Sequence, residues 1–148
     1  MPFEKGIIVR KIELAVILLF SICFWSAAIA ATNEETLTDI AKQQGLFFFY
    51  SSSCPHCQSF APILKKFSEH YGFSVLAISV DGGFLPDFPD AVMNKDQAKI
   101  FQVAMFPSLF LVDPQRQIAS LVAEGNIVEG ELTRRILQIN AMQSKASP

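Results

Sequence analysis

Two cysteines separated by two residues, Cys54 and Cys57, are the side chains of this sequence best suited to chemistry. They stand in the string Cys-Pro-His-Cys, which follows the apolar run 46–50 and three serines. A helix beginning at the first thiol would leave that sulfur beside unpaired backbone N–H groups and the positive end of the helix dipole, which favour thiolate over thiol. Because the thiolate is the form that attacks disulfides, this spacing predicts thiol–disulfide exchange.

Each of the two cysteines has its own predicted role. Cys54 is the attacking sulfur, because a helix start lowers a thiol pKa from about 8.5 to roughly 3.5–7.5. Cys57, one helical turn further and more buried, resolves a mixed disulfide by attacking Cys54. A zinc half-site is the alternative, but it needs four ligands, and only His56 and His70 are available to complete it. We therefore expect no metal and no other cofactor.

The two residues between the thiols are predicted to tune them. An imidazole at His56 can donate a hydrogen bond or partial charge to the Cys54 thiolate, and stabilising the reduced form makes a disulfide more oxidising. The alternative is an exposed loop histidine. Pro55 also suits the first turn of a helix, where the missing N–H is no loss.

Residues 1–30 are expected to form a secretory signal. Three basic residues precede the apolar run Leu14 to Trp25, and Ala28-Ile29-Ala30 supplies an A-x-A cleavage site. The alternative is an uncleaved membrane anchor, since Ile12 to Ala31 is just long enough to span a bilayer. Cleavage near Ala30 predicts export, for which the bacterial periplasm is the expected destination, and no membrane contact afterwards.

Composition narrows the class of protein. The chain has 148 residues, 51% of them hydrophobic, which suits one compact domain. Cleavage after Ala30 would remove three of 12 basic and two of 14 acidic residues, leaving a net charge of about −3 and no basic patch. We therefore expect no nucleic-acid partner. Cleavage would also remove Cys23, and the remaining closely spaced pair cannot staple a fold, which favours redox chemistry in an oxidising compartment.

The rest of the chain predicts alternating helices and strands. Helices are expected from Thr32 or Asn33 to Gly45, over 54–71, after Asn94 and from Glu129. Strands are expected over 46–50, 73–80, 108–112 and 117–124, the first of them buried on both faces because it is wholly apolar. The predicted organisation is a signal over 1–30, an α/β domain over 31–142 and a flexible tail over 143–148.

This order of elements and three local strings resemble the thioredoxin superfamily over residues 33–140. The strings are FFFY followed by SSSCPHC, APIL at 61–64 and MFPSLFLV at 105–112. The resemblance implies a thioredoxin-like α/β fold, with a central mixed sheet of about four strands flanked by helices. It also implies that Pro107 is a cis-proline facing the thiols, where Phe106 and Pro107 bind an extended substrate segment. Without the resemblance, Pro107 would be a strand-initiating proline.

A narrower similarity covers the string from Phe47 to Phe73 and the string SVDGGFLPDFPDA after it. Both resemble the TrbB family of F-type conjugative transfer and the related C-terminal domain of TraF. The resemblance implies a periplasmic isomerase or oxidase whose substrates are cysteine-containing proteins of the conjugation and pilus-assembly apparatus, with a separate redox partner. A non-catalytic binding or chaperone module for the same clients is the alternative. We expect a monomer, because the chain is too short for an added dimerisation domain.

The resemblance is incomplete beside the motif. Thioredoxins carry a buried acid beneath the second cysteine, where this sequence has Phe48, and often a tryptophan before the motif, where it has Ser53. Both differences argue against a fast general reductant and leave the direction of electron flow open. Residues Phe84 to Phe88 are expected either to form a lip that faces the substrate or to pack their aromatic rings on the core.

Overall fold

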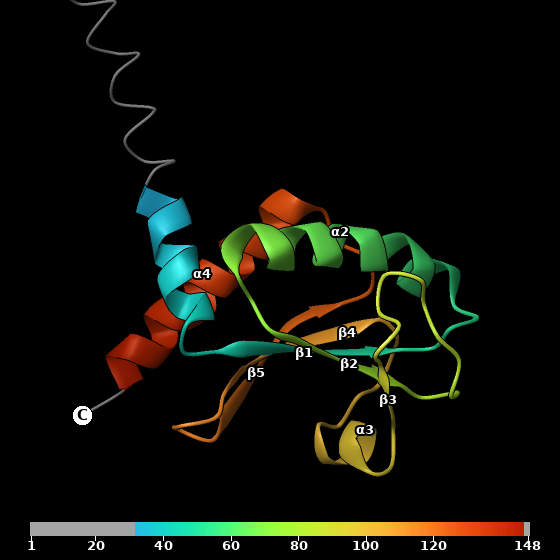
Figure 1. The fold of residues 1–148 in the computed structure, drawn as a ribbon. Helices are drawn as coiled ribbons and strands as arrows, with labels where there is room; N and C mark the ends of the chain where they lie inside the picture. The colour runs from blue at the N-terminus through green and yellow to red at the C-terminus, as the bar shows by residue number, and fades with distance from the viewer. Residues whose placement is uncertain (1–31, 147–148) are drawn as a thin grey trace, which may run out of the picture. The chain divides into compact units, whose positions relative to one another are not determined.

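A five-stranded mixed sheet forms the centre of the protein, with the strand order β3-β2-β1-β4-β5 (Figure 1). The computed structural model describes residues 32–146. β1 is parallel to β2 and antiparallel to β4, while β2 and β3 are parallel and β4 and β5 antiparallel. The strands are β1 (Gly45–Tyr50), β2 (Val75–Ser79), β3 (Val92–Met93), β4 (Ser108–Asp113) and β5 (Ile118–Glu124).

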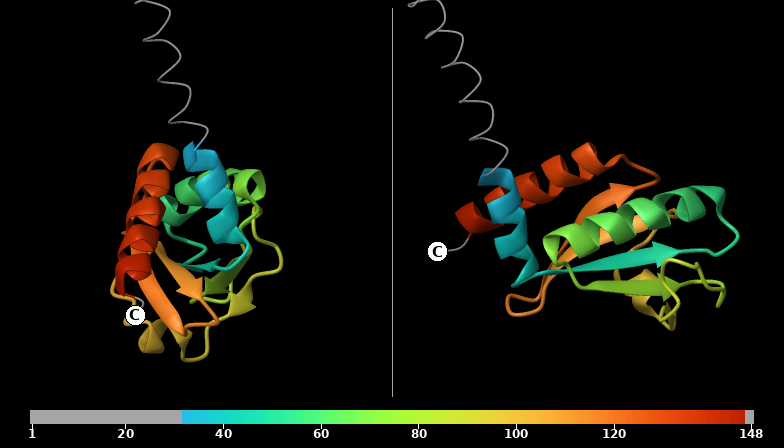
Figure 2. Two further views of the ribbon diagram at one scale, coloured as in Figure 1. Left: turned by 90° about the vertical axis from the view of Figure 1, so that its left-hand side faces the viewer. Right: turned by 45° about the horizontal axis from the view of Figure 1, so that its top comes forward.

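Helices cover both faces of this sheet. α2 (Pro55–Tyr71) and α4 (Glu129–Ala146) lie over one face, and the short α3 (Gln97–Ile100) lies over the other (Figures 1 and 2). A further helix spans residues 32–41 and contributes Leu37 and Ile40 to the core beneath α2 and α4. The α/β fold with a mixed sheet is confirmed; β3, with only two residues, was too short to predict.

Strand β1 is apolar throughout because both of its faces are buried. Leu46, Phe48 and Tyr50 join the core that α2 and α4 cover, whereas Phe49 joins a second cluster on the face of α3 and Phe47 packs against it. Successive side chains of a strand point to opposite faces, so a strand covered on both sides needs apolar residues at every position. The central place of β1 follows, and its end delivers the chain to the cysteine pair.

Helix α2 owes its position to its first and last residues. Cys54 is the N-cap with extended backbone angles, and Pro55 occupies the first turn. At the other end Gly72 adopts a φ of 82°, and its N–H donates to the Ser68 carbonyl. The helix continues through Pro62 and buries Cys57 on the face that meets the sheet. The predicted strand-to-helix setting of the motif is confirmed.

Both terminal helices differ from their predicted limits. The first helix ends at residue 41 rather than at Gly45. The predicted boundary of the flexible tail at Gln143 is wrong, because α4 continues to Ala146. Gln143 is buried and its amide donates to the Ser120 hydroxyl on β5 at 3.1 Å, which holds this turn of the helix against the sheet. The predicted signal over 1–30 lies outside the described residues. Within 32–146, no helix is both long and apolar enough to cross a membrane.

Candidate active site

The cysteine pair lies where β1 passes into α2. The chain leaves β1 at Tyr50 and turns through three serines, and the Cys54 N–H donates to the Ser51 carbonyl at 3.2 Å. Because α2 begins immediately afterwards, the Cys54 sulfur stands at a helix N-terminus, where the helix dipole and free N–H groups favour an anion. The sequence analysis predicted this arrangement.

The two thiols differ in their access to solvent. Cys54 is half-buried, whereas Cys57 has an exposed fraction of 0% and belongs to the hydrophobic core. No disulfide joins them. A protein substrate can therefore reach the first sulfur, while the second is reachable only from within the protein.

The same contrast appears in the acidity of the two thiols. Burial acts to raise the pKa of Cys54, but hydrogen bonds from the Cys57 backbone, the Cys57 thiol and the His56 backbone together outweigh it, so this pKa lies below its ordinary value. Burial raises the pKa of Cys57 to about 12, and the negative charges of Cys54 and Asp81 add to the effect. Of the two sulfurs, Cys54 therefore loses its proton at the lower pH.

The loop before β4 brings Phe106 and Pro107 to the thiols. The peptide bond between these two residues is cis, as the resemblance implied. The Cys54 thiol lies 3.8 Å from the Phe106 carbonyl oxygen, within the range of a hydrogen bond to sulfur. Phe106 is half-buried and Pro107 is buried. The structure therefore brings the cis peptide Phe106-Pro107 beside Cys54, although the two segments are remote in sequence.

Pro55 and His56 lie on the outer side of this group. Both residues are exposed. The hydrogen bond from His56 that helps to lower the pKa of Cys54 comes from its backbone N–H. The predicted role of the imidazole stays a prediction.

Phe48 and the segment Phe84 to Phe88 complete the surroundings. Phe48 is fully buried in the same core cluster as Cys57 and has no group that could accept a proton. In the loop, Leu85 and Phe88 are buried in that cluster as well, whereas Phe84 is 67% exposed. The loop thus packs one aromatic ring on the core and leaves another in solvent.

Sequence reasoning missed Asp81 as a member of the site and took it only as part of a turn. Its carboxylate accepts hydrogen bonds from the Ser51 hydroxyl and the Ser52 N–H, both at 2.8 Å. A signal was available. Asp81 follows the end of one apolar run and Ser51 the end of another, and parallel neighbouring strands bring such ends together at one edge of a sheet.

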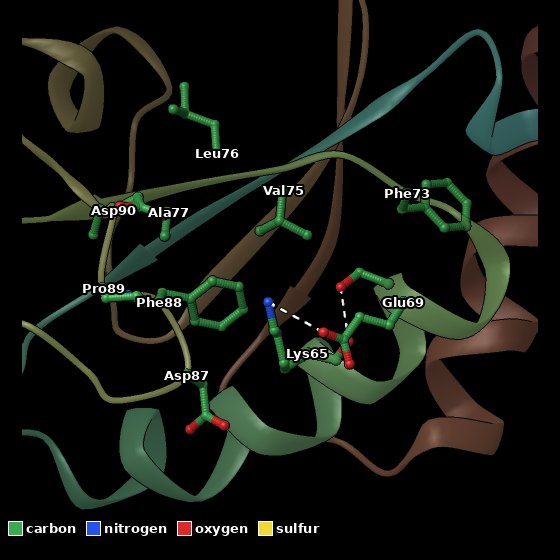
Figure 3. A pocket seen from close by; sticks show the side chains of 12 residues that line it. Lys65, Glu69, Phe73, Val75, Leu76, Ala77, Asp87, Phe88, Pro89 and Asp90 are labelled. Atoms are coloured by element: carbon green, nitrogen blue, oxygen red, sulfur yellow. Dashed lines mark hydrogen bonds and ion pairs between the residues drawn. The ribbon is translucent and has the colours of Figure 1, made fainter.

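A separate pocket of about 240 Å³ lies between α2, β2 and the loop 87–91 (Figure 3). Its walls include Phe73, Val75 and Phe88, and an ion pair between Lys65 and Glu69 spans 3.3 Å beside them. Neither cysteine lines it. Among the residues that the structure describes, no group of three or more His, Cys, Asp or Glu side chains is placed to hold a metal ion.

Comparison with known sequences identifies relatives of this chain. A family model described as TraF, F plasmid transfer operon protein, matches residues 23–137. Protein TraF of Escherichia coli strain K12 is 31% identical over 114 residues, which make up 77% of this chain and 46% of TraF. Protein TrbB of the same strain is 41% identical over 44 residues, or 30% of this chain and 24% of TrbB. The chain thus spans less than half the length of either relative.

Solved structures share the fold. One solved structure is described as the thiol:disulfide interchange protein DsbE from Chlorobium tepidum. It aligns with a TM-score of 0.55 and 19% identity, over 69% of this chain and 83% of that one. The reduced N-terminal domain of PilB from N. meningitidis aligns with a TM-score of 0.51 and 18% identity, over 66% and 81%. These likenesses confirm the thioredoxin-like fold. Because the family model covers residues 23–137, including both cysteines of the site, the chain belongs to the TraF family.

Proposed function

We propose that this chain is an exported thiol–disulfide oxidoreductase, an isomerase or oxidase that acts on cysteine-containing proteins of a conjugative-transfer apparatus. The observation that carries the proposal is the difference in burial and pKa between the two thiols. Cys54 is half-buried and has a lowered pKa, whereas Cys57 is fully buried and has a raised pKa. This arrangement suits disulfide exchange, because a substrate protein can reach the first thiol and the buried second thiol can resolve the mixed disulfide.

In isomerisation, the Cys54 thiolate attacks one sulfur of a substrate disulfide. A bond forms between Cys54 and that sulfur, the substrate disulfide breaks, and the other substrate cysteine leaves as a thiolate. A third substrate cysteine then attacks the mixed disulfide, which forms the new substrate disulfide and returns Cys54 as a thiolate. No net electrons are exchanged.

In oxidation, the protein starts with a bond between Cys54 and Cys57. A substrate thiolate attacks Cys54, and Cys57 leaves as a thiolate that takes up a proton. A second substrate thiolate then displaces Cys54, so the substrate loses two electrons and the protein gains them. A redox partner must reoxidise the pair before the next cycle.

The surroundings of Cys57 favour these two reactions over general reduction. Reduction requires Cys57 to attack the mixed disulfide, and for this it must first lose its proton. Burial, the largest cause of its raised pKa, remains when Cys54 is bound to a substrate, and Phe48 in the same core cluster offers no base. A slow second attack gives the mixed disulfide time to rearrange.

The proposed substrates and location come from the relatives and the expected signal. The matching family model is described as an F plasmid transfer operon protein, which supports clients in conjugative transfer. A secretory signal over residues 1–30 would bring the chain to the periplasm, where disulfides persist. The backbone of Phe106, beside Cys54, is positioned to pair with an extended client segment.

A trapping experiment tests the proposal. Cys57→Ala removes the resolving thiol, so a substrate attacked by Cys54 should stay attached as a disulfide-linked adduct. We expect reductant-sensitive adducts on non-reducing gels of cells that carry a conjugative plasmid, and mass spectrometry should identify transfer proteins in them. The control variant, Cys54→Ser with Cys57→Ala, should trap nothing.

Two outcomes would contradict the proposal. If Cys57→Ala traps no exported protein through Cys54, the assignment of conjugation substrates has no basis. If Cys54→Ser supports plasmid transfer as fully as the unchanged chain, the non-catalytic binding module is the correct reading.

A further inference from the structure

Asp81, the second residue of the loop after β2, connects two segments beside the thiol pair. Its Oδ2 accepts hydrogen bonds from the Ser51 hydroxyl at 2.8 Å and from the N–H and hydroxyl of Ser52 at 2.8 and 3.0 Å. Its Oδ1 accepts from the Gly83 N–H at 3.1 Å and lies 3.0 Å from the Ser79 hydroxyl. One carboxylate therefore ties the turn 51–53 to the end of β2 and to the loop after it.

The turn that Asp81 holds is the one that delivers Cys54. The Cys54 N–H bonds back to the Ser51 carbonyl, and the Gln58 amide of α2 donates to the Ser52 carbonyl at 2.8 Å. The turn is thus held from the sheet by Asp81 and from the helix by Gln58. Movement of this turn would displace the Cys54 sulfur from the Phe106 carbonyl, 3.8 Å away.

The fit between the two segments is close. A Cβ atom on Gly83 would collide with the side chain of Ser52, so any larger residue there would push the turn away from Asp81. The Tyr50 hydroxyl donates to the Gly83 carbonyl at 3.1 Å and fixes the same loop from β1. The turn 51–53 and the loop at Gly83 therefore pack closely, with little room for either to shift.

We propose that Asp81 is a positioning residue for the thiol pair, whose carboxylate locks the turn before Cys54 to the end of β2 and places a fixed negative charge at that turn. This inference rests on the proposed exchange reaction and adds a residue that controls its second step.

The charge on Asp81 is permanent at physiological pH. Burial acts to raise its pKa, but the hydrogen bonds from Ser51, Ser52 and Gly83 outweigh it and hold that pKa well below its usual range. Burial is the largest cause of the raised pKa of Cys57, and the charges of Cys54 and Asp81 add to it. The other titratable groups nearby are Tyr50 on β1, whose pKa burial raises, and His56 beside Cys57 in the chain.

The anion acts on the step in which Cys57 attacks the mixed disulfide. That attack forms the bond between Cys54 and Cys57, releases the substrate as a thiolate and sends the proton of Cys57 to solvent. A negative charge nearby opposes the Cys57 thiolate, so it slows this step without touching substrate. Asp81 thereby prolongs the mixed disulfide.

A single-turnover reaction of the reduced protein with dithiobisnitrobenzoate, an aromatic disulfide, tests the proposal. Cys54 attacks first and releases one coloured thiolate, and Cys57 then releases the second. We expect Asp81→Asn to speed the second phase about twofold to tenfold at neutral pH and to lower its pH midpoint accordingly. Asp90→Asn, which removes an exposed charge from the same loop, should leave both unchanged.

The possible results separate the inference from the proposed function. A second phase whose pH midpoint is the same in Asp81→Asn, Asp90→Asn and the unchanged chain overturns the role of the charge, since a merely structural role would alter stability and not this midpoint. If the unchanged chain shows no first phase, Cys54 does not attack disulfides and the proposed exchange reaction is overturned. A first phase with no second phase overturns only the role of Asp81 in the attack by Cys57.

A second variant tests the lock by itself if Asp81→Asn does not fold. Ser51→Ala combined with Ser52→Ala keeps the carboxylate and removes two of its hydroxyl donors. We expect the first phase to be slower, because the turn no longer holds Cys54 in place. The pH midpoint of the second phase should be unchanged, because the carboxylate of Asp81 remains. A first phase as fast as in the unchanged chain overturns the lock.

Discussion

At the scale of single residues, the site depends on two identical side chains in different surroundings. Cys54 has hydrogen-bond donors and the start of a helix beside its sulfur, whereas Cys57 is enclosed by the core and faces negative charge. This difference in pKa between the two thiols directs nucleophilic attack to the Cys54 sulfur. It also explains why the residues around the motif matter as much as the motif itself.

The pH dependence of alkylation follows from this difference. The thiolate fraction of a cysteine rises with pH and reaches one half at its pKa, and only the thiolate reacts. In the reduced protein, Cys54 should therefore react with iodoacetamide with a midpoint below that of a free cysteine, about 8.5. Cys57 should stay unmodified until far more alkaline pH. Mass spectrometry of peptides after timed alkylation measures both, and equal midpoints would contradict the assignment.

Replacement of His56 tests the tuning role of its imidazole. His56→Ala should raise the pKa of Cys54 and make the disulfide less oxidising, because a donor to the thiolate is lost. A shift on the order of 30 mV, tenfold in the equilibrium with glutathione, is expected. His70→Ala, near the far end of α2, is the matched control. A redox titration in which the two variants agree would restrict the contribution of His56 to its backbone.

At the scale of elements, the junction of β1 and α2 positions the site. β1 is anchored by side chains buried on both of its faces, and only four residues separate its end from the start of α2. The position of Cys54 is therefore set by the packing of two long elements rather than by the turn alone. Asp81 adds a connection from the neighbouring strand β2.

Phe48 shows how strongly that packing is needed. Its ring is fully buried and lies 5.2 Å from the Tyr50 ring and 5.4 Å from the Phe88 ring, measured between centroids. Phe48→Ala should lower the free energy of unfolding by about 3–5 kcal/mol, because a large cavity is left beneath α2. Phe84→Ala, at an exposed phenylalanine, should change it by less than about 0.5 kcal/mol. Denaturant titrations of both variants measure this, and equal losses would contradict the assignment of Phe48 to the core.

At the scale of the whole molecule, the core is drawn from a continuous stretch of chain. Its buried hydrophobic residues run from Leu37 to Ile139 and join all the layers of the fold. The bounds 31–142 of the predicted domain stay a prediction. We propose that the preceding segment serves export.

Processing of the chain tests that proposal. After expression in a bacterium with a periplasm, the intact mass of the protein should match a chain that starts at Ala31. Ala30→Gln places a bulky residue at the cleavage site and should leave the segment attached. Recovery of the unchanged chain at full length in the membrane fraction would favour the anchor instead.

The sequence by itself determined the features that depend on local order. Apolar periodicity and turn residues located the four longer strands and α2, and they placed the Cys-x-x-Cys motif at the end of β1. These inferences succeed because neighbouring residues and short spacings carry them. The reactivity of Cys54 and Cys57 stays a prediction. The resemblance of the string MFPSLFLV to a known family, rather than its composition, indicated the cis bond at Pro107.

Only the tertiary structure decided what depends on residues far apart in the chain. The two-residue strand β3 exists because β2 offers it a partner, and α4 reaches Ala146 because Gln143 meets Ser120 on β5. Asp81 joins the site because parallel strands end side by side, 30 residues apart in sequence from Ser51. Burial, which separates the acidity of Cys54 from that of Cys57, likewise comes from the assembled core. For Asp81 the ends of two apolar runs were a signal, but the other contacts have no local signal strong enough to reveal them before the chain is folded.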